Sequence, residues 1–145
     1  MDEKVPQEAL LSLLSDRKQG VLVTLKRDGR PQLSNVLHAY DPQERIVRVS
    51  VTADRAKTRN LARDSRASYH VSTADGWAWT VAEGDAELSE MAADPYDRTV
   101  EELVDLYRAI SGEHADWSEY RAAMVDQRRR VVRLHVRHAY GQLRR

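Results

Sequence analysis

Apolar residues recur along this chain at two spacings, and the two spacings predict different elements. Six stretches either alternate apolar with polar residues or run apolar between turn signals, which is typical of β-strands. Turns are indicated by Asp28-Gly29, Asp41-Pro42 and Asp75-Gly76. The predicted strands cover residues 21–25, 31–40, 46–51, 67–73, 77–88 and 132–136.

Helical spacing occurs in other segments. Residues 5–14 place apolar side chains three and four positions apart, which predicts a helix at the start of the chain. The segment 53–67 is short, charged and of helical character. Two more helices are predicted, one at 94–110 with Asp94 as its N-cap and one at 116–130.

Six short strands joined largely by hairpins predict an antiparallel sheet that closes on itself. The fold class is therefore mainly β (α+β), a six-stranded barrel with flanking helices. A doubly wound parallel sheet requires regular alternation of strands and helices, which this pattern lacks. With 145 residues, 41% of them apolar and 32% charged, the whole chain (1–145) is predicted to be one domain.

Composition excludes several kinds of chemistry. The chain has no cysteine, so thiolate nucleophiles, iron–sulfur clusters and cysteine zinc sites are excluded. The five histidines have no metal-binding spacing, and no Gly-rich phosphate loop or nucleophile elbow occurs. We therefore assign no metal and no catalytic side chain, and redox chemistry would need a bound cofactor. His135 and His138 receive no role.

Charge is balanced over the chain but unevenly distributed. Residues 75–126 hold 14 acidic and 3 basic side chains, whereas residues 127–145 hold 7 basic and no acidic ones. A nucleic-acid surface is one interpretation, but a neutral domain lacks the basic excess of nucleic-acid binders. The preferred interpretation is an acidic helical layer beside a basic strand, with no nucleic-acid partner.

No apolar run in the chain approaches the length that spans a membrane, and its first residues lack the apolar core of a leader segment. We expect a cytoplasmic protein with no membrane partner.

One cluster of cations is a candidate anion site. Arg55, Lys57 and Arg59 lie within five residues at the start of the short helix that follows a strand. Backbone N–H groups and the helix dipole favour a phosphate at such a place, and arginine and lysine add charged donors. A solvated helix face is the alternative interpretation.

Two further features are candidates for contact with a flat ring. Gln32 and Ser34 share one face of a predicted strand and Asn35 lies on the other, although a half-exposed strand gives the same pattern. Trp77 and Trp79 are two residues apart and are predicted to share a face, where they either stack on a ring or fill the core.

Three motifs together resemble a known family. They are GVLVTL at 20–25, DGRPQLSNV at 28–36 and RAKTRNL at 55–61. In combination they resemble the pyridoxamine-phosphate-oxidase-like split β-barrel superfamily. DGW at 75–77, VAEG at 81–84 and the run 106–114 are similar to its actinobacterial deazaflavin-dependent branch.

The resemblance implies a homodimer that binds coenzyme F420 in a groove at the subunit interface. Residues like Arg55 and Lys57 would hold the coenzyme's phosphate, and Lys26, Arg27, Arg30 and Arg59 are candidates by charge for its oligoglutamate tail. The implied coenzyme contacts are Gln32, Ser34, Asn35, Val49, Ser50, Arg55, Ala56, Lys57, Thr58, Asn60 and, from the neighbouring subunit, Trp77 and Trp79.

The implied function is that of an F420-dependent oxidoreductase, which transfers hydride from F420H2 to a small unsaturated organic substrate. Two alternatives stay open. One is an FMN-binding enzyme of the same fold, because both coenzymes carry a phosphate on a ribityl chain. The other is a non-catalytic F420 binding or carrier protein.

Overall fold

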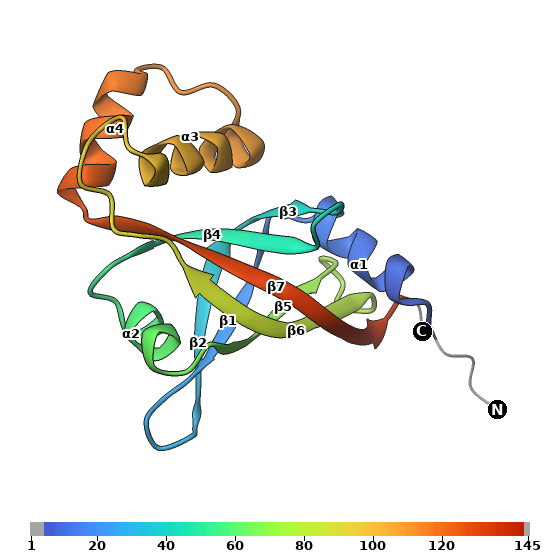
Figure 1. The fold of residues 1–145 in the computed structure, drawn as a ribbon. Coiled ribbons are helices and arrows are strands. Elements are labelled where there is room, and N and C mark those ends of the chain that lie inside the picture. The colour runs from blue at the N-terminus through green and yellow to red at the C-terminus, as the bar shows by residue number, and fades with distance from the viewer. Residues whose placement is uncertain (1–4, 144–145) are drawn as a thin grey trace.

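One curled antiparallel sheet makes up most of the molecule (Figure 1). The structure, a computed structural model, describes residues 5–143, and its strands pair in the order β2-β1-β5-β6-β7-β4-β3. The predicted fold class is confirmed. The strands are β1 (Gln19–Leu25), β2 (Pro31–Leu37), β3 (Ala39–Asp41), β4 (Ile46–Thr52), β5 (Arg66–Ser72), β6 (Trp79–Leu88) and β7 (Arg129–Gln142).

The sheet has seven strands where the pattern predicted six. The predicted strand 31–40 is divided at His38, whose buried ring is hydrogen-bonded to the Leu14 carbonyl (2.8 Å) and whose backbone N–H donates to the Lys18 carbonyl (2.8 Å). The chain turns there, so that β2 pairs with β1 and β3 pairs with β4. Alternation of apolar residues does not reveal such a change of partner.

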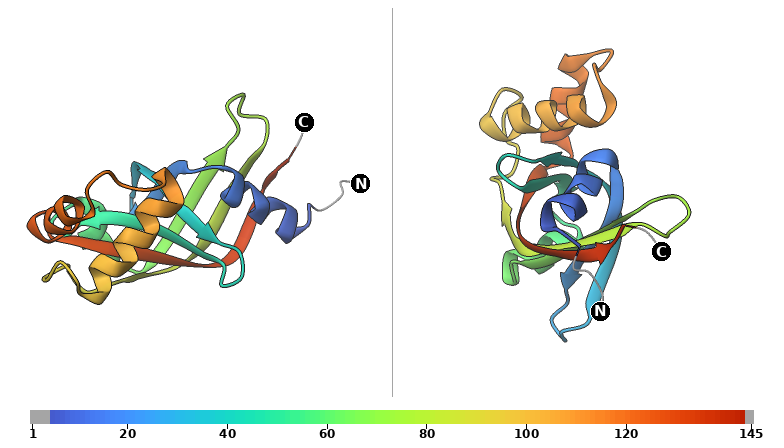
Figure 2. Two further views of the ribbon diagram at one scale, coloured as in Figure 1. Left: turned by 90° about the horizontal axis from the view of Figure 1, so that it is seen from above. Right: turned by 90° about the vertical axis from the view of Figure 1, so that its right-hand side faces the viewer.

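Alternate strand positions fill the inside of the curled sheet. Leu22, Tyr69 and Leu134 are each no more than 1% exposed and belong to one core. Helix α1 (Gln7–Asp16), which starts two residues later than predicted, packs its apolar face, including Leu14, against that core (Figure 2).

A helical hairpin lies outside the barrel between β6 and β7 (Figure 1). It consists of α3 (Arg98–Ser111) and α4 (Trp117–Asp126). A second core forms under it, in which Val100 and Met124 pack with Val131 of β7. Because Val131 is on β7, this core fixes the hairpin to the sheet.

The helices of this hairpin differ from the prediction at their ends. Asp97 is the N-cap of α3 in place of Asp94, because its carboxylate accepts a hydrogen bond from the Val100 N–H at 2.9 Å. Helix α4 ends at Asp126 and does not reach Arg130, since Arg128 has a φ of 52° that breaks the helix and β7 starts at the next residue.

Ion pairs explain the uneven charge along the chain. Glu102 of α3 accepts hydrogen bonds from Arg133 of β7 (2.5 Å) and Arg48 of β4 (2.9 Å). Asp85 pairs with Arg137 at 2.8 Å. Basic β7 therefore lies beside acidic residues of helix α3, as the preferred interpretation predicted, and also beside acidic residues of strand β6.

Candidate functional site

The predicted anion-binding segment forms helix α2 (Ala56–Arg63), which begins where β4 ends (Figure 1). The Thr58 hydroxyl donates to the Thr52 carbonyl at 2.7 Å and so ties the helix to the strand. Arg55 is the N-cap, and no side chain in the described part of the protein accepts the N–H groups of the first turn. These backbone N–H groups are therefore available to donate hydrogen bonds to an anion.

Three cations gather at this turn. Arg55 and Lys57 come from the start of α2, and Arg129 is the first residue of β7, where it pairs with Thr52 of β4. Burial lowers the pKa of Lys57, and the positive charges of Arg55 and Arg129 lower it further. Burial also lowers the pKa of Arg129, and the charge of Arg55 acts in the same direction.

Within residues 5–143 none of these three cations forms an ion pair with a carboxylate. Like charges that are held together and partly removed from water favour the binding of an anion. We call Arg55, Lys57 and Arg129 the cation cluster.

A groove of about 670 Å³ runs along one face of α2, between this helix and the β1–β2 hairpin. The predicted coenzyme contacts Gln32, Ala56 and Asn60 line it, so the fold brings residues from β2 and α2 together. The groove has no acidic residue among its lining residues, whereas its cations are Lys26, Arg27, Arg59 and Arg63.

Three predicted contacts have side chains that are used within the protein. The Asn60 side chain is buried, donates to the Thr24 hydroxyl at 3.1 Å and accepts from Arg63 at 3.3 Å. Thr58 is bonded to the end of β4, as described above, and the Val49 side chain lies in the core. These side chains hold α2 and the sheet in place.

Strand β2 shows the predicted alternation. Gln32 and Ser34 are half-buried on the inner face, which Val36 shares, while Leu33 and Asn35 are exposed on the outer face. Polar groups therefore occur on both faces of this edge strand.

Trp77 and Trp79 lie at the other end of the sheet from α2. Strand β5 starts near α2 at Arg66 and ends at Ser72, which pairs with Trp79, and its seven residues span roughly 20 Å. Trp77 lies in the turn before β6 and Trp79 starts that strand, so the prediction that the two share a strand face is wrong. The ring of Trp79 packs edge-on against Tyr140, with ring centroids 6.0 Å apart.

Two cations of this region were missed by the sequence analysis. Arg63 follows Ala56 at a helical spacing of seven, so its place on the groove face could have been read from the sequence. Arg129 could not, because only the pairing of β7 with β4 brings it beside α2.

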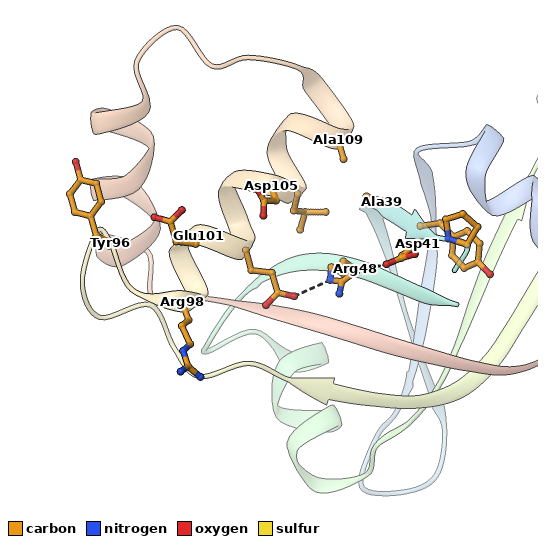
Figure 3. Close-up of a pocket in the computed structure, with 12 residues that line it drawn as sticks. Ala39, Asp41, Arg48, Tyr96, Arg98, Glu101, Asp105 and Ala109 are labelled. Atoms are coloured by element: carbon orange, nitrogen blue, oxygen red, sulfur yellow. Dashed lines mark hydrogen bonds and ion pairs between the residues drawn. The ribbon is translucent and has the colours of Figure 1, made fainter. Parts of the chain in front are cut away.

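A second cleft, of about 810 Å³, lies between α3 and the β3–β4 hairpin (Figure 3). Its half-buried charges are neutralised within the protein, because Glu102 is bonded to Arg48 and also to Arg133. The cation cluster has no such internal partner, so the region beside α2 is the better candidate for an anionic ligand.

The two histidines of β7 contact other side chains of the protein. His135 pairs with Glu87 at 3.0 Å, and His138 lies beside the ring of Tyr140. In the part of the chain that the structure describes, no group of three or more potential ligand side chains is placed to hold a metal ion. None of the helices described there has the length and apolarity needed to cross a membrane.

Comparison with known proteins finds relatives in sequence and similar solved structures. The F420H(2)-dependent biliverdin reductase of Mycobacterium tuberculosis (strain CDC 1551 / Oshkosh) is 34% identical over 79 residues, which cover 54% of this chain and 56% of that protein. This chain thus spans about half the length of that relative.

Two solved structures are similar over nearly the whole chain. A conserved hypothetical protein from Mycobacterium tuberculosis has a TM-score of 0.72 at 21% identity, covering 98% of this chain and 90% of that one. An F420 reductase has a TM-score of 0.69 at 24% identity, covering 94% and 98%. At these identities the similarity supports the fold.

Of these sequence comparisons, the family match covers the larger part of the chain. The family described as "Pyridoxamine 5'-phosphate oxidase" matches residues 6–143, which include every strand and helix described above. The F420H(2)-dependent relative agrees with the resemblance seen in the motifs. The chain therefore belongs to the pyridoxamine 5'-phosphate oxidase family, and this relative supports the F420-dependent branch of it.

Proposed function

We propose that this protein is an F420-dependent oxidoreductase that transfers hydride from F420H2 to a small unsaturated organic substrate. The observation that carries the proposal is the cation cluster, which has no carboxylate partner among the described residues and lies beside a groove lined with further cations. The F420H(2)-dependent relative supports the choice of coenzyme, and its substrate, biliverdin, supports an unsaturated acceptor.

The residues of the site fit the charge of such a coenzyme. Arg55 and Lys57 are proposed to hold the phosphate, and the cations of the 670 Å³ groove would suit the oligoglutamate tail. The proposed ring and ribityl contacts are Gln32, Ser34, Asn35, Val49, Ser50, Ala56, Thr58 and Asn60. Of these, Val49, Thr58 and Asn60 would contribute through their backbone, because their side chains are used within the protein. The coenzyme supplies the hydride chemistry when bound, while the chain binds it, orients it and excludes water.

A homodimer in the cytoplasm is part of the proposal. Trp77 and Trp79 lie at the far end of the sheet from their own α2, so they would reach a coenzyme only from a second copy of the chain. We propose that they close the groove of the neighbouring subunit.

Two alternatives make different predictions. An FMN-binding enzyme of this fold would prefer FMN to F420. A carrier would bind F420H2 but would not oxidise it in the presence of an unsaturated acceptor such as biliverdin.

The test is a fluorescence titration of the protein with F420 and, separately, with FMN. We expect tighter binding of F420. Lys57→Ala should weaken it by about 1.5 to 3 kcal/mol, the range for a charge-assisted hydrogen bond, and leave the fold intact. Lys18→Ala is the matched control, because the Lys18 ammonium bonds to the Ile110 carbonyl and lies outside the site.

Three results would change the proposal. Equal affinity of Lys57→Ala and the wild type for F420 would exclude the proposed phosphate site. A preference for FMN would favour the first alternative. Binding of F420H2 without any oxidation by added acceptors would favour the carrier.

A further inference from the structure

A hollow of about 330 Å³ lies on the outer face of the sheet and shares no lining residue with the α2 groove. A row of residues across three strands lines it, because Val21 of β1 is directly opposite both Asn35 of β2 and His70 of β5. Residues directly opposite one another direct their side chains to the same face. Arg17, which follows α1, and Ser72 of β5 line the hollow as well.

The polar side chains of this hollow have no partner within the described protein. Among residues 5–143, the side chains of Arg17, Asn35, His70 and Ser72 form no hydrogen bond, and Arg17 forms no ion pair. The His70 ring contacts the ring of Trp79, with centroids 6.1 Å apart, but neither of its nitrogens is bonded there. Since Arg17, His70 and Ser72 are half-buried, a ligand could supply the bonds that they lack.

The charge of the hollow indicates an anionic ligand. Among the described residues that line it none is acidic, and Arg17 is the one permanent cation. A guanidinium without a carboxylate partner is suited to bind a carboxylate through two parallel hydrogen bonds. Val21 and Ala74 add apolar surface, and the volume is at the lower end of the range for small-molecule sites. A small organic carboxylate therefore fits the hollow better than an inorganic anion.

The hollow adjoins the proposed coenzyme site. Gln32 of β2 lines the α2 groove, and Asn35 of the same strand lines the hollow. Three residues of a strand span roughly 10 Å. Both residues are proposed coenzyme contacts, and β2 is an edge strand of the sheet. A coenzyme that extends along this edge from the groove would therefore bring its ring next to the hollow.

We propose that this hollow binds the hydride acceptor, an unsaturated organic carboxylate whose carboxylate group is held by Arg17 and whose remainder contacts His70 and Asn35. The identity of this ligand as the hydride acceptor rests on the proposed function. The acceptor's double bond gains a hydride on one carbon and a proton on the other, both of which F420H2 loses on oxidation to F420. The carboxylate group does not react and serves only for binding.

The test uses cinnamate, a flat unsaturated carboxylate, and cinnamamide, its neutral counterpart. Both are titrated into the isotope-labelled full chain and followed by two-dimensional NMR. We expect cinnamate to shift the amide signals of Val21, His70 and Ser72 and to bind roughly 10-fold more tightly than cinnamamide. Inorganic phosphate should bind at the hollow more weakly than cinnamate. Equal binding of the two cinnamic probes, or shifts confined to other parts of the chain, would contradict the inference.

Variants identify the group that holds the carboxylate. Arg17→Gln should weaken cinnamate binding roughly 10-fold and leave cinnamamide binding unchanged, and Arg17→Lys should recover part of the loss. His70→Phe keeps a ring beside Trp79 but removes the nitrogens, and should weaken cinnamate binding several-fold. Arg98→Gln, at an exposed position at the start of α3, is the matched control for loss of one positive charge and should bind cinnamate as the wild type does. Unchanged cinnamate affinity in Arg17→Gln would overturn the proposed site.

A second measurement asks whether the bound carboxylate lies beside the coenzyme. With oxidised F420 and cinnamate bound together to the wild type, we expect nuclear Overhauser effects between cinnamate and the ring protons of F420. If both ligands bind and no such effect is seen, the hollow is not the acceptor site.

The outcomes separate this inference from the proposed function. If Lys57→Ala weakens F420 binding while cinnamate does not bind at the hollow, the inference is wrong and the proposed function stands. If cinnamate binding depends on Arg17 but F420 does not bind, the carboxylate site stands without the role of acceptor site, and the proposed function is wrong.

Discussion

At the scale of single residues, the buried pair of His38 and Tyr69 joins α1 to the sheet. The Leu14 carbonyl can only accept, so His38 Nε2 donates to it (2.8 Å) and Nδ1 accepts from the Tyr69 hydroxyl (2.5 Å). Burial lowers the pKa of His38 below its ordinary value of 6.5, although the bond to Leu14 acts in the opposite direction. The imidazole is therefore held neutral in the folded protein.

We expect the protein to lose stability as the pH falls below about 6.5. Unfolded His38 binds a proton near that pH, whereas folded His38 binds one only at lower pH, so acid favours the unfolded state. The stabilising contribution is complete above pH 6.5 and is lost as the pH falls towards the folded pKa. Urea unfolding at about pH 7.5 and about pH 5.5 measures the change.

Two variants identify the group responsible. His38→Gln should be less stable than the wild type at both pH values and should show a smaller change between them. His138→Gln, at an exposed position, should keep the wild-type change. The same pH dependence in His38→Gln and wild type would exclude His38 as the cause.

At the scale of elements, the ion pairs of Glu102 connect α3 with β4 and β7. Burial by itself raises the pKa of Glu102, but hydrogen bonds from Arg133 and Arg48 outweigh it, and the pKa lies below its ordinary value. The Glu102 side chain is 19% exposed, and its removal would leave Arg133 with Glu87 at 3.4 Å and Arg48 with Asp41 at 3.9 Å as their remaining, longer ion pairs.

Glu102→Ala is therefore expected to destabilise the protein. Loss of one partner of a buried pair costs about 3 to 5 kcal/mol. The partial exposure and the remaining carboxylates of Asp41 and Glu87 place the expected loss below that range, at about 1 to 3 kcal/mol. Asp105→Ala is the control on the same helix, because this exposed residue should change stability by no more than about 0.5 kcal/mol. Urea unfolding of both variants measures the difference, and equal stabilities would show that the pairing contributes little.

At the scale of the whole molecule, the proposed coenzyme contacts are divided between the two ends of the sheet. The cation cluster and the α2 groove lie at one end, and Trp77 and Trp79 lie at the other. If both ends act on the same coenzyme, two copies of the chain must meet with these ends together. The dimer would then be required for binding.

Mixed dimers test this arrangement. We expect a solution mass of twice 16.6 kDa for the protein. Lys57→Ala chains and Trp77→Ala chains should each bind F420 weakly as homodimers. Co-expressed and purified through two different tags, they should form mixed dimers in which one site carries both substitutions and the other carries neither.

Half of the sites in the mixed dimers should therefore bind F420 with wild-type affinity in a fluorescence titration. A monomeric protein, or mixed dimers in which no site regains wild-type affinity, would contradict a site built from two subunits.

The sequence by itself determined the class of fold and the position of helix α2, the proposed anion-binding segment. Strand alternation, hairpin turns and helical spacing are local properties, so the antiparallel sheet, its flanking helices and α2 could be predicted from them. Arg55 and Lys57 are close in the chain, and their place at the start of a helix is also local.

Only the tertiary structure decided which distant residues complete the site. Arg129 reaches the cation cluster because β7 pairs with β4, and the partner of a strand depends on packing across the whole sheet. The same holds for the bend at His38, where a buried ring bonded to α1 divides one predicted strand into two. Such features depend on pairing between distant segments, and the spacing of apolar residues within one segment does not reveal that pairing.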